Sequence, residues 1–342
     1  MESVVASPQQ QQVIACFTAS SRKRHLVLEG PAGTGKTLVA LQVANNLIES
    51  NKATAKEGLG PVLVVTTQHR EEVDPIMRYL DDGTANAATK VFKMYHDIKK
   101  EYEVSESEED KEISLLTKAL GKRWEGRQIV MLLDEIGSCG AFKNLNDIDI
   151  HESVRMILVV NPVISNIFPT LPSSFLRVTL TTPYRSTIAI TSLAQFIAKK
   201  KGMLIPEGDF GSDVKGSKPI FFDVGNDEKK MKEALTYSRD QLGDNATILY
   251  AGLSDSMKMM VKEQGKEAGG PWACYRAGNF YGWEADQVVA VTTGYSTIEL
   301  ITRAKTRLIF ILTSRDSYYE KYEKTKQYFQ LVSAQGLVEI KL

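Results

Sequence analysis

Residues 30–37 read Gly-Pro-Ala-Gly-Thr-Gly-Lys-Thr and satisfy every fixed position of the phosphate-binding loop Gly-x-x-x-x-Gly-Lys-Ser/Thr. The apolar run Leu26–Leu28 precedes the loop, and apolar residues recur at helical spacing after it. Such a loop joins a strand to a helix, because its backbone N–H groups and the positive end of the helix bind phosphate oxygens together. We therefore predict a nucleoside triphosphate site made by Gly30, Pro31, Ala32, Gly33, Thr34, Gly35, Lys36 and Thr37.

Side chains of the loop, and two more that follow a later strand, predict the chemistry of this site. Lys36 is expected to reach the β- and γ-phosphates, and the Thr37 hydroxyl is expected to be a Mg²⁺ ligand. Asp134 and Glu135 directly follow the apolar run Ile129–Leu133, so they lie where a buried strand leaves its sheet. Asp134 would hold Mg²⁺ directly or through water, and Glu135 would polarise the attacking water. The predicted cofactors are ATP and Mg²⁺.

Short apolar runs alternate with helical stretches along the chain, which predicts parallel sheets covered by helices on both faces. The expected strands are Leu26–Leu28, Pro61–Thr66, Val91–Tyr95, Ile129–Leu133, Met156–Val160 and Arg177–Leu180 in a first set, and Pro219–Val224, Ala246–Tyr250, Gln287–Val291 and Leu308–Leu312 in a second. Two α/β halves follow from this division. The acidic interval Glu101–Glu112 is expected to be part of a small solvated insertion at about residues 96–125.

The charge and hydropathy of the chain limit the classes of partner that we expect it to bind. Lys and Arg together number 42, as do Asp and Glu, so no global positive field draws the protein to nucleic acid. A local basic groove is still compatible with this balance. No apolar run approaches the length of a membrane span, and the N-terminal residues carry no apolar signal core. We expect a soluble intracellular protein of the cytoplasm or nucleus that does not contact a membrane.

Four further segments occur in a fixed order around the loop. The first is Pro8–Val13, which contains four consecutive glutamines, and the second is Thr182–Thr187, which reads Thr-Pro-Tyr-Arg-Ser-Thr. The third is Asn279–Val289, with Gly-Trp-Glu-Ala-Asp at its centre, and the fourth is Thr302–Leu308, which begins Thr-Arg-Ala-Lys. Together with the phosphate loop, this order resembles the UvrD/Rep-like branch of superfamily 1 helicases. The resemblance spans nearly the whole chain.

The resemblance implies a role for one or two residues of each segment. Gln10 would read the adenine edge, as the Q motif does, and Tyr184 would stack on the adenine. Arg185 and Arg303 would contact the γ-phosphate and sense its presence, and Glu284 would accept a hydrogen bond from the ribose. Lys36, Glu135, Arg185 and Arg303 are thus the catalytic candidates.

The family architecture implies two RecA-like P-loop domains with parallel sheets flanked by helices, with ATP in the cleft between them. The first would span residues 1–182 and carry the Q motif, the phosphate loop and the Asp134-Glu135 pair. The second would span residues 183–342 and carry the arginines.

Three departures from the family pattern concern nucleic-acid contact and motion along a strand. Ile164 stands where the family has the glutamine that links the γ-phosphate to nucleic acid, and Ile cannot hydrogen-bond. The segment Thr66–Glu72 lacks the base-stacking phenylalanine expected there. The chain also has no room for the large lever domain of UvrD-like enzymes.

The expected activity is that of an ATP-hydrolysing helicase or translocase acting on single-stranded nucleic acid, with DNA and RNA both open. The alternative is a nucleotide-gated switch on the same fold, which would present a surface to a protein partner.

Overall fold

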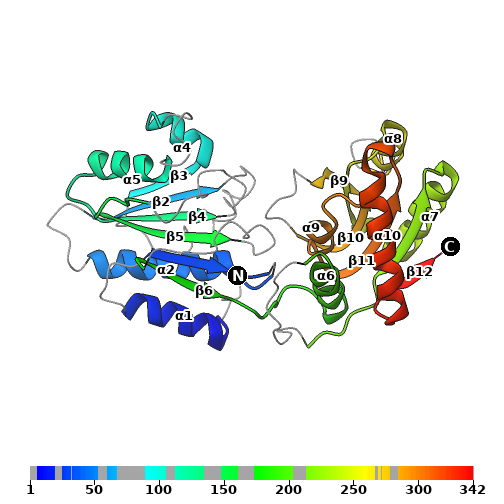
Figure 1. Cartoon of the computed structure of the whole chain (residues 1–342), viewed down its shortest axis with the longest axis horizontal. Helices are drawn as coiled ribbons and strands as arrows, with labels where there is room; N and C mark the ends of the chain where they lie inside the picture. Colours follow the sequence, from blue (N-terminus) through cyan, green and yellow to red (C-terminus); the bar gives the residue numbers. More distant parts are fainter. Residues whose placement is uncertain are drawn as a thin grey trace. The chain divides into compact units, whose positions relative to one another are not determined.

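The computed structural model describes residues 6–19, 25–31, 33–52, 60–67, 89–104, 112–134, 148–160, 173–202, 213–265, 269–270, 272–277 and 284–341. The chain divides into two compact units, Met1–Thr181 and Thr182–Leu342 (Figure 1). The sequence placed this boundary one residue further along. Each unit has a sheet and a hydrophobic core of its own.

The first unit is built on a six-stranded sheet in the order β3-β2-β4-β5-β1-β6, and every neighbouring pair is parallel. Its strands are β1 (His25–Glu29), β2 (Val62–Thr67), β3 (Thr89–Met94), β4 (Ile129–Asp134), β5 (Val154–Val160) and β6 (Phe175–Thr179). Its helices are α1 (Pro8–Ala19), α2 (Lys36–Lys52), α4 (Tyr95–Glu101) and α5 (Glu112–Arg123). Strand β5 lies between β1, which leads into the phosphate loop, and β4, which ends at Asp134.

Alternate residues of each central strand pack on opposite faces of this sheet. In β1, Leu26 and Leu28 join the core under α1 and α2, whereas Val27 joins the core under α4 and α5. Both faces are therefore buried, which explains why the strands read as continuous apolar runs rather than as an alternating pattern. The two helical layers lie on either side of the sheet in Figure 1.

The helices α4 and α5 correct the insertion that the sequence predicted at about residues 96–125. Their residues Ile98, Ile113 and Leu116 belong to the buried core of the first unit. Glu112, at the end of the acidic interval, is 3% exposed and pairs with Lys99. A buried carboxylate is tolerated because a cation compensates its charge. The acidic composition concealed a helix that covers one face of the sheet.

The second unit has another wholly parallel six-stranded sheet, in the order β12-β7-β11-β10-β8-β9. Its strands are β7 (Ile220–Gly225), β8 (Thr247–Ala251), β9 (Ala273–Arg276), β10 (Ala285–Thr292), β11 (Ala304–Thr313) and β12 (Glu339–Lys341). Its helices are α6 (Ile188–Lys200), α7 (Glu228–Leu242), α8 (Asp255–Glu263), α9 (Thr297–Ile301) and α10 (Tyr319–Ala334), with two short 3-10 turns, η6 (Gly243–Asn245) and η9 (Asp316–Tyr318).

Aromatic packing marks one face of the second sheet. The Phe329 ring of α10 stacks on Phe221 with centroids 4.2 Å apart and lies 4.7 Å from Phe310. On the opposite face, the core includes Met231 of α7 and Met257 of α8. The predicted fold class, two α/β units of the RecA-like type with parallel sheets between helical layers, is confirmed. Among the described residues, no helix has the length and apolarity needed to cross a membrane.

Candidate nucleotide-binding site

The phosphate loop follows β1 and leads into α2, at the carboxyl end of the sheet. Gly35 has φ +79°, a backbone conformation that side-chain-bearing residues rarely adopt. A Cβ at Gly35 would also lie 2.5 Å from Gln10 Nε2. At Gly30, a Cβ would lie 2.4 Å from the carbonyl oxygen of Leu180. Both glycines are thus required by the close approach of neighbouring atoms, which fits a loop that wraps phosphate oxygens with its backbone.

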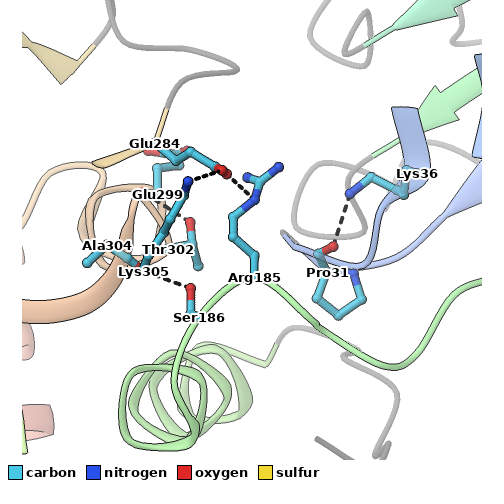
Figure 2. A network of polar contacts seen from close by, with 9 residues as sticks. All are labelled: Pro31, Lys36, Arg185, Ser186, Glu284, Glu299, Thr302, Ala304 and Lys305. Atoms are coloured by element: carbon cyan, nitrogen blue, oxygen red, sulfur yellow. Dashed lines mark hydrogen bonds and ion pairs between the residues drawn. The ribbon is translucent and has the colours of Figure 1, made fainter. Parts of the chain in front are cut away.

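Lys36 is the first residue of α2, and its side chain turns back over the loop. The residue is 8% exposed, and its Nζ donates to the carbonyl oxygen of Gly30 at 2.9 Å. Its Nζ also donates to the carbonyl oxygen of Pro31 at 3.0 Å (Figure 2). Thr34 Oγ1 also donates to Pro31 O, at 3.0 Å. A buried ammonium held across the mouth of a glycine loop is placed to meet an anion there.

The residue pair expected to hold Mg²⁺ comes together in the structure. Thr37 Oγ1 donates to Asp134 Oδ2 at 2.8 Å, although the two residues are 97 positions apart. Asp134 is 3% exposed at the end of β4, beside β5. A hydroxyl and a carboxylate supply the hard oxygen ligands that Mg²⁺ prefers, with phosphate and water oxygens completing its shell. The chemistry of this donor set fits an ATP–Mg²⁺ complex.

Gln10 contacts the phosphate loop through its side chain. Its Nε2 donates to Thr34 O at 2.9 Å, and its Oε1 accepts from Ser7 N at 2.8 Å. The residue is 5% exposed. The structure thus resolves which glutamine of the run 9–12 faces the loop, and Gln10 anchors α1 to it. Gln9 instead bonds Thr181, with Nε2 donating to Oγ1 at 3.3 Å.

A second cluster lies in the second unit, where three segments of the chain meet. These segments carry Arg185, Glu284 and Arg303. Glu284 forms ion pairs with Arg185 and with Lys305, the latter at 2.8 Å between Oε1 and Nζ (Figure 2). The side chains of these residues are about one quarter to one third exposed. Glu284 therefore orients Arg185, whereas the resemblance assigned it to a ribose hydroxyl.

Hydrogen bonds to backbone carbonyl oxygens hold these segments in register. Ser186 Oγ donates to Ala304 O at 2.7 Å, and Thr187 N donates to Lys305 O at 2.9 Å. Ala285 N donates to Arg303 O at 3.0 Å. Glu284 and Arg303 thus stand at the amino ends of the adjacent strands β10 and β11, with residues 185–187 bonded alongside. Tyr184, expected to stack on the adenine, is 39% exposed.

Several predicted residues lie outside the part of the chain that the structure describes. These are Ala32 of the loop, the proposed base Glu135, Ile164 and residues 68–72. Their roles stay predictions.

Sequence reasoning missed two polar contacts near the site. Lys305 shares the Glu284 carboxylate, and only its place in the Thr-Arg-Ala-Lys segment hinted at a role. Glu29, just before the loop, is 8% exposed and bonds Arg177 Nη2 at 2.7 Å and Thr179 Oγ1 at 2.5 Å. No local pattern could reveal this contact, because β1 and β6 are far apart in the chain.

The comparisons with known proteins agree with this geometry. A family model described as "Type III restriction enzyme, res subunit" matches residues 3–140, which include Gln10, the phosphate loop and Asp134. Residues 3–140 therefore have the character of a helicase-like ATPase domain. The sequence matches no curated protein.

Solved structures of Dbp5 from S. cerevisiae are similar to the whole core. A Dbp5 variant bound to a Gle1 variant and IP6 is 12% identical, with a TM-score of 0.45 over 98% of this chain and 88% of that one. The Dbp5 variant bound to RNA and ADP BeF3 is also 12% identical, with a TM-score of 0.42 over 98% and 89%. Likeness of this degree assigns no residue a role. The superfamily 1 branch therefore rests on the sequence motifs alone.

Proposed function

We propose that the chain hydrolyses ATP at the phosphate loop and couples hydrolysis to single-stranded nucleic acid, as a member of the superfamily 1 branch. The observation that carries the ATPase part is the combination of Lys36 buried over a glycine loop with the Thr37–Asp134 pair beside it. The order of the motifs around that loop supports the superfamily 1 branch.

The residues of the first unit divide the work of binding. Backbone N–H groups of the loop and the amino end of α2 bind the phosphates, and Lys36 exchanges its carbonyl partners for phosphate oxygens. Thr37 and Asp134 would hold Mg²⁺, which would neutralise charge on the phosphates. Glu135 orients the attacking water and accepts its proton.

The second unit contributes cations, according to the resemblance. Arg185 and Arg303 would spread positive charge over the γ-phosphate as negative charge develops there. Glu284 acts on this step through Arg185, because its carboxylate holds the guanidinium in place. Glu284 is thus proposed as a positioning residue. Single-stranded nucleic acid is proposed as the substrate because the motif order is that of a helicase core.

The first test is the effect of Lys36→Ala on ATP turnover and on binding of a fluorescent ATP analogue. Removal of a charge-stabilising donor from such a site is expected to lower turnover by about a hundredfold or more. The control is Lys118→Ala, since Lys118 is an exposed lysine of α5 that pairs with Asp149. Full turnover in Lys36→Ala, with Lys118→Ala also active, would show that the nucleotide site is elsewhere.

A further inference from the structure

Beyond the motifs already described, an aromatic and cationic cluster lies at the carboxyl ends of β10 and β11. Tyr295 follows β10, and Tyr318 follows β11 at the start of α10. Their ring centroids are 5.9 Å apart, and the Tyr295 side chain is 47% exposed. Lys321 Nζ lies 4.6 Å from the Tyr295 ring centroid and 5.4 Å from that of Tyr318. Arg315 lies 5.9 Å from the Tyr318 ring.

Hydrogen bonds from threonine hydroxyls to backbone carbonyl oxygens fix the loop that carries Tyr295. Thr292 Oγ1 donates to Tyr295 O at 2.6 Å, and Thr297 Oγ1 donates to Gly294 O at 2.9 Å. Ser296 has φ +55°, which non-glycine residues rarely adopt, so the turn is held against an intrinsic preference. Gly294 packs on α10 so closely that a Cβ would lie 2.4 Å from Lys321 O. The tyrosines and Lys321 are therefore held together rather than merely near one another.

Charged side chains of both signs lie near the two rings, and the cations Lys321 and Arg315 are the ones that contact the rings. Burial lowers the pKa of Lys201, which follows α6, and repulsion from Lys321 lowers it further. Glu299 is the carboxylate that offsets this effect. Glu320 is engaged by Lys324 at 2.6 Å, and Asp316 begins the turn η9. Cations in contact with two rings, of which that of Tyr295 is exposed, favour an anionic ligand with flat apolar groups.

We propose that Tyr295, Tyr318, Lys321 and Arg315 form a binding surface for single-stranded nucleic acid, in which bases stack on the tyrosines and phosphates meet the cations. Single strands supply both parts of this chemistry, because every base has a flat face and every linkage carries a negative charge. A duplex keeps its bases stacked inside, so it would meet the cations only. The inference rests on the proposed function and assigns residues that none of the helicase-like motifs contains.

The surface connects directly to one of the arginines. Helix α9 runs from the Tyr295 loop to Arg303, and Thr297, Ile298, Leu300 and Ile301 are all buried in it. Helix α9 thus lies along the chain between the tyrosine surface and Arg303.

The test measures binding of fluorescently labelled single-stranded oligonucleotides to the whole chain by anisotropy. Tyr295→Ala is expected to weaken binding about tenfold, the effect of losing one stacked base, whereas Tyr295→Phe keeps the affinity within about twofold. Lys321→Ala is expected to lower the salt dependence of binding by about one counterion. The control Tyr319→Ala removes another tyrosine, 57% exposed, whose ring faces Tyr322 instead; it should bind like the wild type.

Three outcomes would overturn the proposal. Equal affinity of Tyr295→Ala and wild type would remove the tyrosine surface while leaving nucleic-acid binding intact. If inorganic polyphosphate competed as well as an unlabelled single-stranded oligonucleotide, the surface would be purely electrostatic and would accept any acidic partner. No binding of any single strand by the wild type would reject the surface together with the nucleic-acid part of the proposed function, while the ATPase part would still stand on Lys36.

Discussion

At the scale of single residues, the phosphate loop is where sequence and structure correspond most closely. Gly35 and Lys36 follow from a local pattern, because the loop is made by consecutive residues. The partner of Gln10 needed the structure, because α1 must first pack on α2 before its amide reaches Thr34. The Glu29–Arg177 pair gives no signal in the sequence at all, since it joins two strands that are neighbours only in the folded sheet.

A comparison of Gly35→Ala with Gly202→Ala separates the cost of backbone strain from the cost of crowding at the phosphate loop. Gly35 and Gly202 both have positive φ, but a Cβ at Gly202 would meet no atom within 4 Å. We expect Gly202→Ala to cost about 1 kcal/mol of stability, from its backbone conformation alone. Gly35→Ala should cost more and also weaken ATP-analogue binding, because Gln10 must move. Thermal unfolding and analogue titration measure both effects; equal behaviour of the two variants would contradict the crowding argument.

His25 gives the first unit a dependence on pH. Burial, aided by the nearby Arg155, lowers the His25 pKa to about 4, and His25 Nδ1 accepts from Met156 N at 3.2 Å. The folded state therefore disfavours the charged imidazole. Its contribution to stability is complete above the unfolded pKa of about 6.5 and falls as the pH decreases toward 4.

The corresponding variant is His25→Gln, which cannot titrate. Between pH 7 and pH 5 the wild type should lose about 2 kcal/mol more than this variant, as an upper value, because the unfolded chain gains the proton that the folded chain resists. Urea unfolding at the two pH values measures the difference. An identical pH dependence in both proteins would show that His25 is not buried in its neutral form.

At the scale of elements, the central strands and both edge strands of the first sheet were predictable, whereas the edge strands of the second sheet were not. Strands β1, β2, β4 and β11 are covered on both faces, so their sequences are continuous apolar runs. Strands β9 and β12 at the sheet edges are short and partly exposed, which left no run to detect. Helix α5 was not predicted, for another reason. The acidic residues before it indicated a solvated segment, whereas the amphipathic face of the helix packs in the core.

The amino end of β10 carries the Glu284 carboxylate that holds the Arg185 side chain. Glu284→Gln keeps the shape of the side chain and removes the charge that holds Arg185 and Lys305. We expect kcat for ATP to fall about tenfold while the KM changes less, since the arginine is proposed to act as γ-phosphate charge develops. The control is Asp286→Asn, an exposed carboxylate two positions along β10. A rise in KM alone would favour the ribose contact that the resemblance assigned to Glu284.

At the scale of the whole molecule, two separate parallel sheets carry the two halves of the proposed chemistry. In the proposal, the first would supply phosphate and Mg²⁺ ligands from the carboxyl ends of β1 and β4, where Lys36 contacts Gly30 and Thr37 contacts Asp134. The second supplies Arg185 and Arg303 beside the amino ends of β10 and β11, and the tyrosine surface at their carboxyl ends. This division could be predicted from the motif order, because each motif follows or precedes a buried strand. The tyrosine surface could not, because its residues come from separate loops.

The central claim is that ATP hydrolysis in this chain responds to single-stranded nucleic acid. Its most direct test is the steady-state rate of ATP turnover at low salt, measured with and without single-stranded DNA or RNA, with Lys36→Ala as the background. We predict stimulation of about tenfold or more, weakening as salt screens the phosphate contacts. A rate unchanged by either nucleic acid at low salt, with no detectable binding of either, would contradict the claim.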